Sequence, residues 1–346
     1  MNLKMNSRKN SHGGAKLRLL SMAAGLLMAF GVVAQPAAPA ASAAGADQWV
    51  TLGTGGGPLI RVQRSEPANA LVVKGTVYLF DTGSGTERQL TAAGLKLADV
   101  KAIFISHHHI DHDADLGQLM SSRWMFNSYA PLPVIGPPGT VKMVADLASA
   151  VRPVEWAGIG DFAGKPRPRV GDSIKPVDLP STMDEPTEVY RDDNIRVLAV
   201  TNAHYHYPEG SESARMARSY SYRVETPSRS IVYTGDTGPS ANVERLAKGA
   251  DLLVSEVIDL DKMEKILVHT PDLPAAMRPS MLRHMEEDHL TPQAVGHIAA
   301  AAGVKAVVLT HLAPGMDNEP DPDSYARGVA PAYTGPVTVA RDLQRF

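Results

Sequence analysis

The chain has 346 residues, of which 34 are Lys or Arg, 37 are Asp or Glu, 12 are His and none is Cys. A hydrophobic content of 44% with 21% charged residues is typical of a folded globular protein and excludes a disordered one. Without Cys, the chain cannot form disulfides, thiol nucleophiles, iron–sulfur clusters or Cys-ligated zinc, so any bound metal must have His and carboxylate ligands.

Residues 1–44 are typical of a signal peptide followed by an Ala- and Pro-rich leader. Basic side chains between Lys4 and Arg18 precede an apolar run from Leu19 to Ala34, and small residues typical of a cleavage site follow. This 16-residue run is short for a membrane-spanning helix of about 20 residues, although an uncleaved anchor is the alternative. We therefore expect a periplasmic or secreted protein with no stable membrane span, in which residues 45–346 form one folded domain.

The first half of this domain begins with strands and continues with helices. Alternating or apolar runs separated by turn residues predict strands at 49–57, 59–64, 70–83 and 100–107. Helices are expected at 113–125 and at 140–151, the second of which follows a Gly-Pro-Pro-Gly turn. Residues 152–187 are rich in Pro, Gly and charge, and predict a surface loop with short strands.

The second half repeats this order. A strand, a hairpin, a helix leading into a buried strand, and Met-rich helical windows are expected in turn at 195–204, 219–236, 242–257 and 259–288. Thr291 suits a helix N-cap and Pro292 a first helical turn, so a helix to Ala301 should precede a buried strand at 304–311. Two β-rich halves, each with helices, predict an α+β fold: an αββα sandwich of two β-sheets flanked by helices.

Four imidazoles and one carboxylate crowd residues 106–112, SHHHIDH, directly after an apolar strand. Buried polar groups without partners cost on the order of a few kcal/mol each, so this cluster needs a compensating partner. Divalent metal ions are suitable, because imidazole and carboxylate ligands bind zinc, manganese or iron. His107 and His109 would face the same way on extended chain, whereas Asp111 and His112 follow on a turn and can face a second metal.

Three further apolar strands end in a residue of a type that binds metals: His204, Asp236 and His311. Each residue alone would suggest a cap or a turn. Together with the His cluster, they indicate a metal site along one edge of the sandwich.

The motif HxHxDH at 107–112, the lone His204, the Asp236 of GDTG and the His311 of THL together resemble the metallo-β-lactamase fold over about residues 49–346. The resemblance implies one metal ion held by His107, His109 and His204. It implies a second metal ion held by Asp111, His112 and His311, with Asp236 bridging the two. His206 has its side chain on the same face as His204, and is expected to support the site or face the substrate.

The sequence DHLT at 288–291, followed by a helix and VVLTH, resembles the ribonuclease Z and type III arylsulfatase branch of this fold. This resemblance implies that His289 protonates the leaving group, with the alternative that it merely precedes a helix cap. We expect two metal ions, with zinc as the default and manganese or iron compatible, that generate a hydroxide nucleophile oriented by Asp111. The expected substrate is a small ester, either a phosphodiester or an aryl sulfate.

Nucleic acid is not expected as a partner, for three reasons. Only 31 residues separate His204 from Asp236, which leaves no room for the tRNA-binding arm common in ribonuclease Z. Without the leader, 29 basic side chains face 37 acidic ones. Export would also separate the protein from tRNA precursors. The oligomeric state is not encoded in a readable pattern.

Three alternative functions remain open. A lactonase or β-lactamase would use the same fold and metal site. An aspartic protease would use the two Asp-Thr-Gly triplets at Asp81 and Asp236, but would leave the His cluster unexplained. A non-enzymatic metal-binding protein would need the ligands without an acid catalyst.

Overall fold

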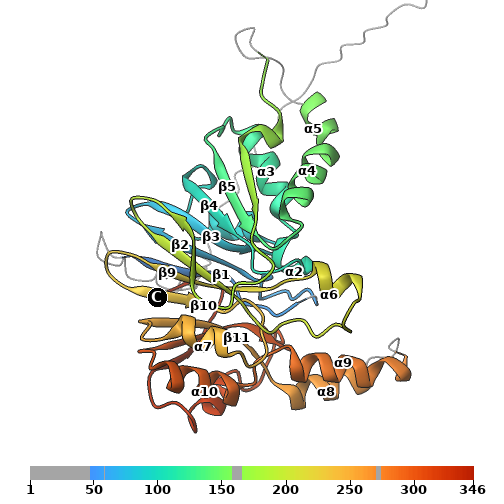
Figure 1. Cartoon of the computed structure of the whole chain (residues 1–346), viewed down its shortest axis with the longest axis vertical. Helices are drawn as coiled ribbons and strands as arrows, with labels where there is room; N and C mark the ends of the chain where they lie inside the picture. Colours follow the sequence, from blue (N-terminus) through green and yellow to red (C-terminus); the bar gives the residue numbers. More distant parts are fainter. Residues whose placement is uncertain (1–46, 58, 158–165, 270–273) are drawn as a thin grey trace, which may run out of the picture. The chain divides into compact units, whose positions relative to one another are not determined.

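The computed structural model describes residues 47–346, except for 58, 158–165 and 270–273 (Figure 1). The leader predicted at 1–44 lies outside these described residues, so the export signal and its cleavage stay predictions. Among the described helices, none is both long enough and apolar enough to cross a membrane.

The described residues form two mixed β-sheets of seven strands each. The first sheet has the order β14-β1-β2-β3-β4-β5-β6 and consists of β1 (Gln48–Gly53), β2 (Ala68–Val73), β3 (Thr76–Thr82), β4 (Val100–Phe104), β5 (Leu132–Gly136), β6 (Ile174–Asp178) and β14 (Gln344–Arg345). The second has the order β13-β12-β11-β10-β9-β8-β7 and consists of β7 (Thr187–Arg191), β8 (Arg196–Thr201), β9 (Tyr220–Glu225), β10 (Ser230–Tyr233), β11 (Leu252–Ile258), β12 (Val307–Ala313) and β13 (Val337–Val339).

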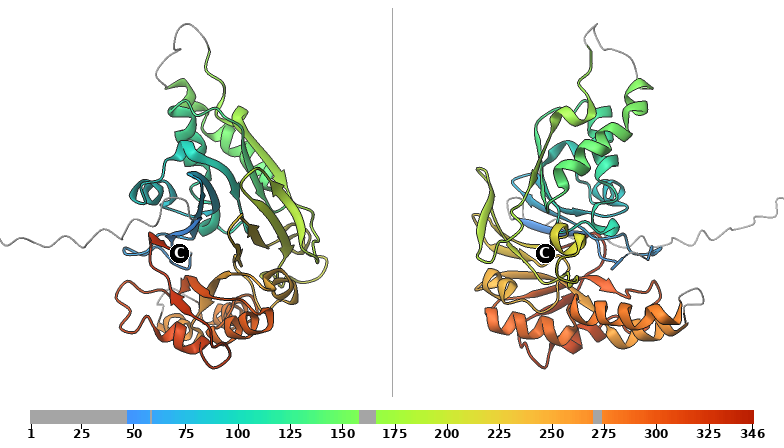
Figure 2. Two further views of the ribbon diagram at one scale, coloured as in Figure 1. Left: turned by 90° about the vertical axis from the view of Figure 1, so that its left-hand side faces the viewer. Right: turned by 45° about the vertical axis from the view of Figure 1, so that its right-hand side comes forward.

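Helices cover the outer face of each sheet (Figure 2). The first sheet is covered by α1 (Thr86–Ala92), α3 (Leu116–Met125) and α4 (Thr140–Ala150). The second is covered by α7 (Ala241–Ala247), α10 (Pro292–Ala302) and α11 (Ser324–Val329). The remaining α-helices are α2 (Ile110–Asp113), α5 (Arg152–Trp156), α6 (Glu212–Met216), α8 (Leu260–His269) and α9 (Arg278–Glu287). The predicted αββα sandwich is therefore confirmed.

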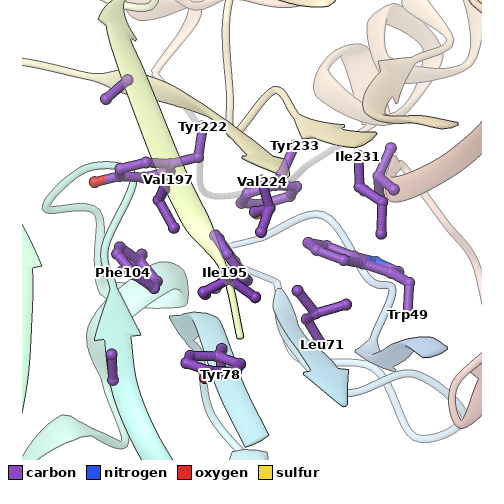
Figure 3. Packing of buried hydrophobic residues seen from close by; sticks show 14 of the residues in the cluster. Trp49, Leu71, Tyr78, Phe104, Ile195, Val197, Tyr222, Val224, Ile231 and Tyr233 are labelled. Carbon is purple, nitrogen blue, oxygen red and sulfur yellow. The ribbon is translucent and has the colours of Figure 1, made fainter. Parts of the chain in front are cut away.

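An aromatic cluster joins the inner faces of the two sheets (Figure 3). Trp49 of β1 and Phe80 of β3 have ring centroids 5.1 Å apart, and Phe80 stacks on Phe104 of β4 at 4.9 Å. Tyr222 and Tyr233 reach this cluster from the second sheet, with centroids 6.1 and 6.3 Å from that of Phe80. Offset and edge contacts of this kind add stability beyond the buried area, so the two sheets and their strand ends are held in a fixed relation.

Two local expectations differ from the structure. Residues 59–64, predicted as a strand, form a loop whose backbone N–H groups at Val62 and Gln63 donate to the Asp317 carboxylate at 2.9 and 2.7 Å. The alternation of apolar and polar residues was misleading, because the backbone N–H groups of this segment bond to a side chain rather than to a neighbouring strand. Residues 152–187, predicted as loop and strand, also contain the helix α5. The N-cap predicted at Thr291 is confirmed, since its hydroxyl accepts a hydrogen bond from Ala294 N.

Candidate metal centre

All seven residues predicted as metal ligands converge on one edge of the sandwich. Their ligand atoms form the overlapping groups His107–His109–His204, His107–His112–Asp236 and Asp111–His112–His311, each with all atoms within 4.8 Å of one another. They come from segments that follow β4, β8 and β10, and from β12 itself. The sandwich therefore assembles residues that lie up to about 200 positions apart in the sequence.

The first group consists of three imidazoles. His107 Nε2 lies 3.1 Å from His109 Nδ1, which in turn lies 3.2 Å from His204 Nε2. Ring nitrogens this close to one another need a proton or a cation between them. Burial lowers the pKa of His204 to about 3 and holds that of His107 well below its usual range, which favours neutral rings with free lone pairs.

The second group combines imidazoles with carboxylates. Asp236 Oδ2 lies 3.1 Å from His311 Nε2, 3.3 Å from His112 Nε2 and 3.8 Å from His107 Nε2, and so stands between the two groups. Asp111 Oδ2 lies 3.4 Å from His112 Nε2 and 3.5 Å from His311 Nε2. Burial opposes a charged His311 ring, but the Asp236 and Asp111 carboxylates outweigh burial and raise its pKa to about 10.

Hydrogen bonds at the outer edge of three rings determine which nitrogen faces inward. His112 Nδ1 donates to Asp81 Oδ2 at 2.8 Å, and His204 Nδ1 donates to the backbone carbonyl of Asp288 at 2.9 Å. His107 Nδ1 is 3.0 Å from Ser106 Oγ, whose own proton goes to Asp81. Each ring therefore directs the lone pair of Nε2 into the cluster, as metal-bound imidazoles do.

Two buried atoms of the cluster without hydrogen-bond partners in the described part of the chain show whether divalent metal ions fit these residues. His112 Nε2 and Asp236 Oδ1 are buried and have no hydrogen-bond partner among the described residues. Burial alone would keep Asp236 neutral, but His311 and His112 hold its pKa well below the usual range. Orphaned buried lone pairs beside an ionised carboxylate are costly unless a cation neutralises them. The donor set, oxygen and nitrogen without sulfur, fits divalent metals such as zinc.

Gly57 brings backbone close to the second group. Its N–H donates to Asp111 Oδ2 at 3.1 Å, and a Cβ at this position would lie 2.2 Å from that same oxygen. Only glycine allows this approach. The glycine-rich segment after β1 thus orients the Asp111 carboxylate.

A pocket of about 260 Å³ opens onto the cluster and is lined by Gly57, His109, Ile110, Asp111, Asp236, His284 and His289. His289 Nδ1 bonds to Glu256 Oε2 at 2.8 Å, which leaves Nε2 as the ring nitrogen available to the pocket. Burial opposes the charged ring, but the Glu256 carboxylate raises the pKa of His289 above its usual value. The predicted acid catalyst therefore has a position and a partner suited to proton donation.

His206 lies outside both ligand groups. Its side chain is half-exposed, and its Nδ1 bonds to the Asp288 carboxylate. The structure thus separates His204, whose Nε2 belongs to the cluster, from His206, which pairs with the Asp288 carboxylate.

Three important residues were missed as site residues in the sequence. Asp81 was considered only as part of an Asp-Thr-Gly triplet, yet it is fully buried and holds His112 and Ser106. Glu256 stands alone in the apolar strand LLVSEVI, and an isolated carboxylate in a buried strand was the signal that a partner exists. Asp288 was named only as the first residue of the DHLT motif, with no role of its own.

Comparison with known proteins identifies the family of this chain. Residues 76–312 match the family model of the β-lactamase superfamily domain, and the chain belongs to the metallo-β-lactamase superfamily. It is a metallo-β-lactamase-fold hydrolase. Ribonuclease Z of Mycobacterium sp. strain KMS is 31% identical over 301 residues, which cover 86% of this chain and 94% of the relative.

Solved structures show the same fold. Human tRNase Z, short form, superposes with a TM-score of 0.58 at 21% identity, covering 86% of this chain and 98% of that one. Zn²⁺-bound PqqB from Methylobacterium extorquens gives 0.59 at 15% identity, covering 86% and 99%.

The prediction that nucleic acid is not a partner is wrong, because relatives that match along most of the chain are ribonucleases. The argument from net charge failed for a physical reason. A site with two divalent cations supplies its own positive charge for a phosphate, so an acidic protein surface does not exclude a polyanionic substrate. The aspartic-protease alternative also fails, since the Asp81 carboxylate is occupied by Ser106, His112 and Tyr233.

Proposed function

We propose that this protein is a metal-dependent phosphodiesterase that hydrolyses phosphodiester bonds of RNA. The observation that supports this function is that the carboxylates Asp111 and Asp236 and the acid candidate His289 open onto the same pocket of about 260 Å³. The names of the relatives, ribonuclease Z and tRNase Z, support RNA as the substrate class.

We propose zinc for both metal sites, one held by His107, His109 and His204, the other by Asp111, His112 and His311, with Asp236 shared. When bound, two such ions would polarise the phosphoryl oxygens and lower the pKa of water. Their ligand type favours zinc, and the Zn²⁺-bound neighbour has the same fold.

The residues of this chain would divide the remaining work. Asp111, fixed by the Gly57 N–H, would orient the attacking water through its carboxylate. His289 would donate the Nε2 proton to the departing ribose oxygen, while Glu256 holds its Nδ1 and is itself held by the Thr237 N–H at 2.6 Å. The carboxylate thereby stabilises the protonated ring before the proton is transferred.

The test is to assay purified protein with quantified zinc on an RNA oligonucleotide and on bis(p-nitrophenyl) phosphate, before and after metal removal by a chelator. We expect turnover that is lost with the metal and restored by zinc. His107→Ala should abolish it, whereas His297→Ala, an exposed histidine on α10, should not. Turnover that survives metal removal would overturn the proposal. So would faster turnover of p-nitrophenyl sulfate or of a lactone, each assayed alongside, than of the two diesters.

We also propose that residues 1–44 direct export, so that the mature enzyme would encounter RNA outside the cytoplasm. The order of basic, apolar and small residues supports this. Cell fractionation with mass spectrometry of the mature N-terminus tests it, and an intact N-terminus in the cytoplasmic fraction would contradict it.

A further inference from the structure

A second histidine cluster adjoins the pocket and has no part in the chemistry above. The Asp288 side chain, which is only 7% exposed, lies between two imidazoles. Its Oδ2 is 2.5 Å from His284 Nδ1, and its Oδ1 bonds to His206 Nδ1. A carboxylate can only accept, so each ring donates from Nδ1, and in its neutral form keeps a lone pair on Nε2.

Of these two rings, His284 is the one that lines the pocket. It stands on α9, and its ring centroid lies 5.4 Å from that of His289 and 6.4 Å from that of His109. His284 therefore presents a hydrogen-bond acceptor beside the proposed acid catalyst.

The C-terminal end of α9, three residues beyond His284, is closely packed. A Cβ at Gly238 would lie 1.9 Å from the carbonyl oxygen of Glu287, so the end of α9 rests directly on the turn after β10. The next carbonyl, that of Asp288, accepts the hydrogen bond from His204. The position of His284 is thus tied to the metal cluster, although α8 and α9 themselves extend beyond the sandwich (Figures 1 and 2).

An acceptor in this position selects for a donor on the substrate. Phosphate oxygens at neutral pH are acceptors, and so they do not pair with the lone pair of His284 Nε2. The hydroxyl groups of ribose are donors, and the 2′-hydroxyl is the group that distinguishes RNA from DNA.

We propose that His284, oriented by Asp288, accepts a hydrogen bond from the ribose 2′-hydroxyl next to the scissile phosphodiester, and thereby makes the enzyme prefer RNA over DNA. This inference rests on the proposed phosphodiesterase function. It names a residue that decides specificity and leaves the cleavage chemistry to His289 and the metal cluster.

The experiment compares kcat/KM of the zinc-loaded enzyme on RNA and DNA dinucleotides of matched sequence. His284→Phe keeps a ring but removes both nitrogens, whereas His284→Gln retains an acceptor. A hydrogen bond contributes on the order of 1–1.5 kcal/mol, so we expect His284→Phe to lower kcat/KM on RNA about tenfold, with DNA unchanged. His284→Gln should restore part of the preference, and His297→Ala should retain all of it. The side chain of His284 is half-exposed, so both variants should fold.

A binding measurement separates failure of this inference from failure of the proposed function. Calorimetry with uridine 3′-monophosphate and 2′-deoxyuridine 3′-monophosphate does not require turnover. Wild-type protein that binds the ribonucleotide more tightly, and loses this preference in His284→Phe, would support the inference even if no diester were cleaved. An unchanged ribose preference in His284→Phe, or an equal loss of both ligands together with inorganic phosphate, would overturn it.

Discussion

Replacing Asp81 by Asn tests whether a residue outside the ligand set controls the metal site. Asp81 Oδ1 accepts from Ser106 N at 2.6 Å, and Oδ2 accepts from Ser106 Oγ at 2.8 Å, His112 Nδ1 at 2.8 Å and Tyr233 OH at 2.7 Å. Asn keeps one oxygen but places an NH₂ group against these three donors. The hydroxyls of Ser106 and Tyr233 can rotate and accept, whereas the N–H of His112 cannot.

The size of the expected effect follows from the contact between Asp81 and His112 Nδ1. Hydrogen bonds to charged groups contribute about 1.5–3 kcal/mol, and His112 would lose such a bond. If the ring instead adopts its other tautomer, Nε2 becomes protonated and loses the lone pair that faces Asp111 and Asp236. Either result weakens the same metal site, and changes of this kind reduce metal affinity about 10- to 100-fold.

The assay is zinc stoichiometry by mass spectrometry, together with competition against a chromophoric chelator. We expect Asp81→Asn to lose one zinc ion selectively, because the zinc affinity of the site that contains His112 falls about 10- to 100-fold. Asp113→Asn is the matched control, because Asp113 is also buried and binds a histidine, His108, at 2.9 Å, but outside the cluster. The reasoning is refuted if Asp81→Asn binds both zinc ions as tightly as wild type.

Three further predictions concern the acid catalyst and the glycine turn. His289→Ala should slow cleavage of diesters with poor leaving groups about 10²–10⁴-fold and p-nitrophenyl diesters much less; equal losses would contradict the acid role. Glu256 raises the pKa of His289 against the effect of burial, and a general acid loses activity as pH rises through its pKa. Glu256→Gln should therefore shift the alkaline limb of the kcat profile to lower pH. An unmoved alkaline limb would argue against this coupling of Glu256 and His289. Gly57→Ala should release zinc, because its Cβ would meet the Asp111 carboxylate at 2.2 Å, with little change in the Tm of the metal-free protein. Gly55→Ala, whose nearest contact is 3.3 Å, should retain zinc in the same stoichiometry measurement.

Most of the fold was readable from local patterns. Apolar periodicity and capping residues such as Thr291 depend on neighbours in sequence, and they gave the two β-rich halves and the helix α10. The pattern failed at 59–64, where the backbone N–H groups bond to Asp317, about 250 residues away. Such a partner leaves no trace in the local alternation of side chains.

The sequence by itself also determined which residues gather at the candidate site, because histidines and aspartates at the ends of apolar strands meet along one edge of a sandwich. Only the tertiary structure decided how each side chain is used. The tautomer of His112 depends on Asp81, 31 positions away, and the proton of His289 depends on Glu256, 33 positions away. The role proposed for His284 likewise depends on its hydrogen bond to Asp288 Oδ2 and on its position in the lining of the pocket. Hydrogen bonds are directional and short, so the partner of a buried group is known only when the chain has brought both together.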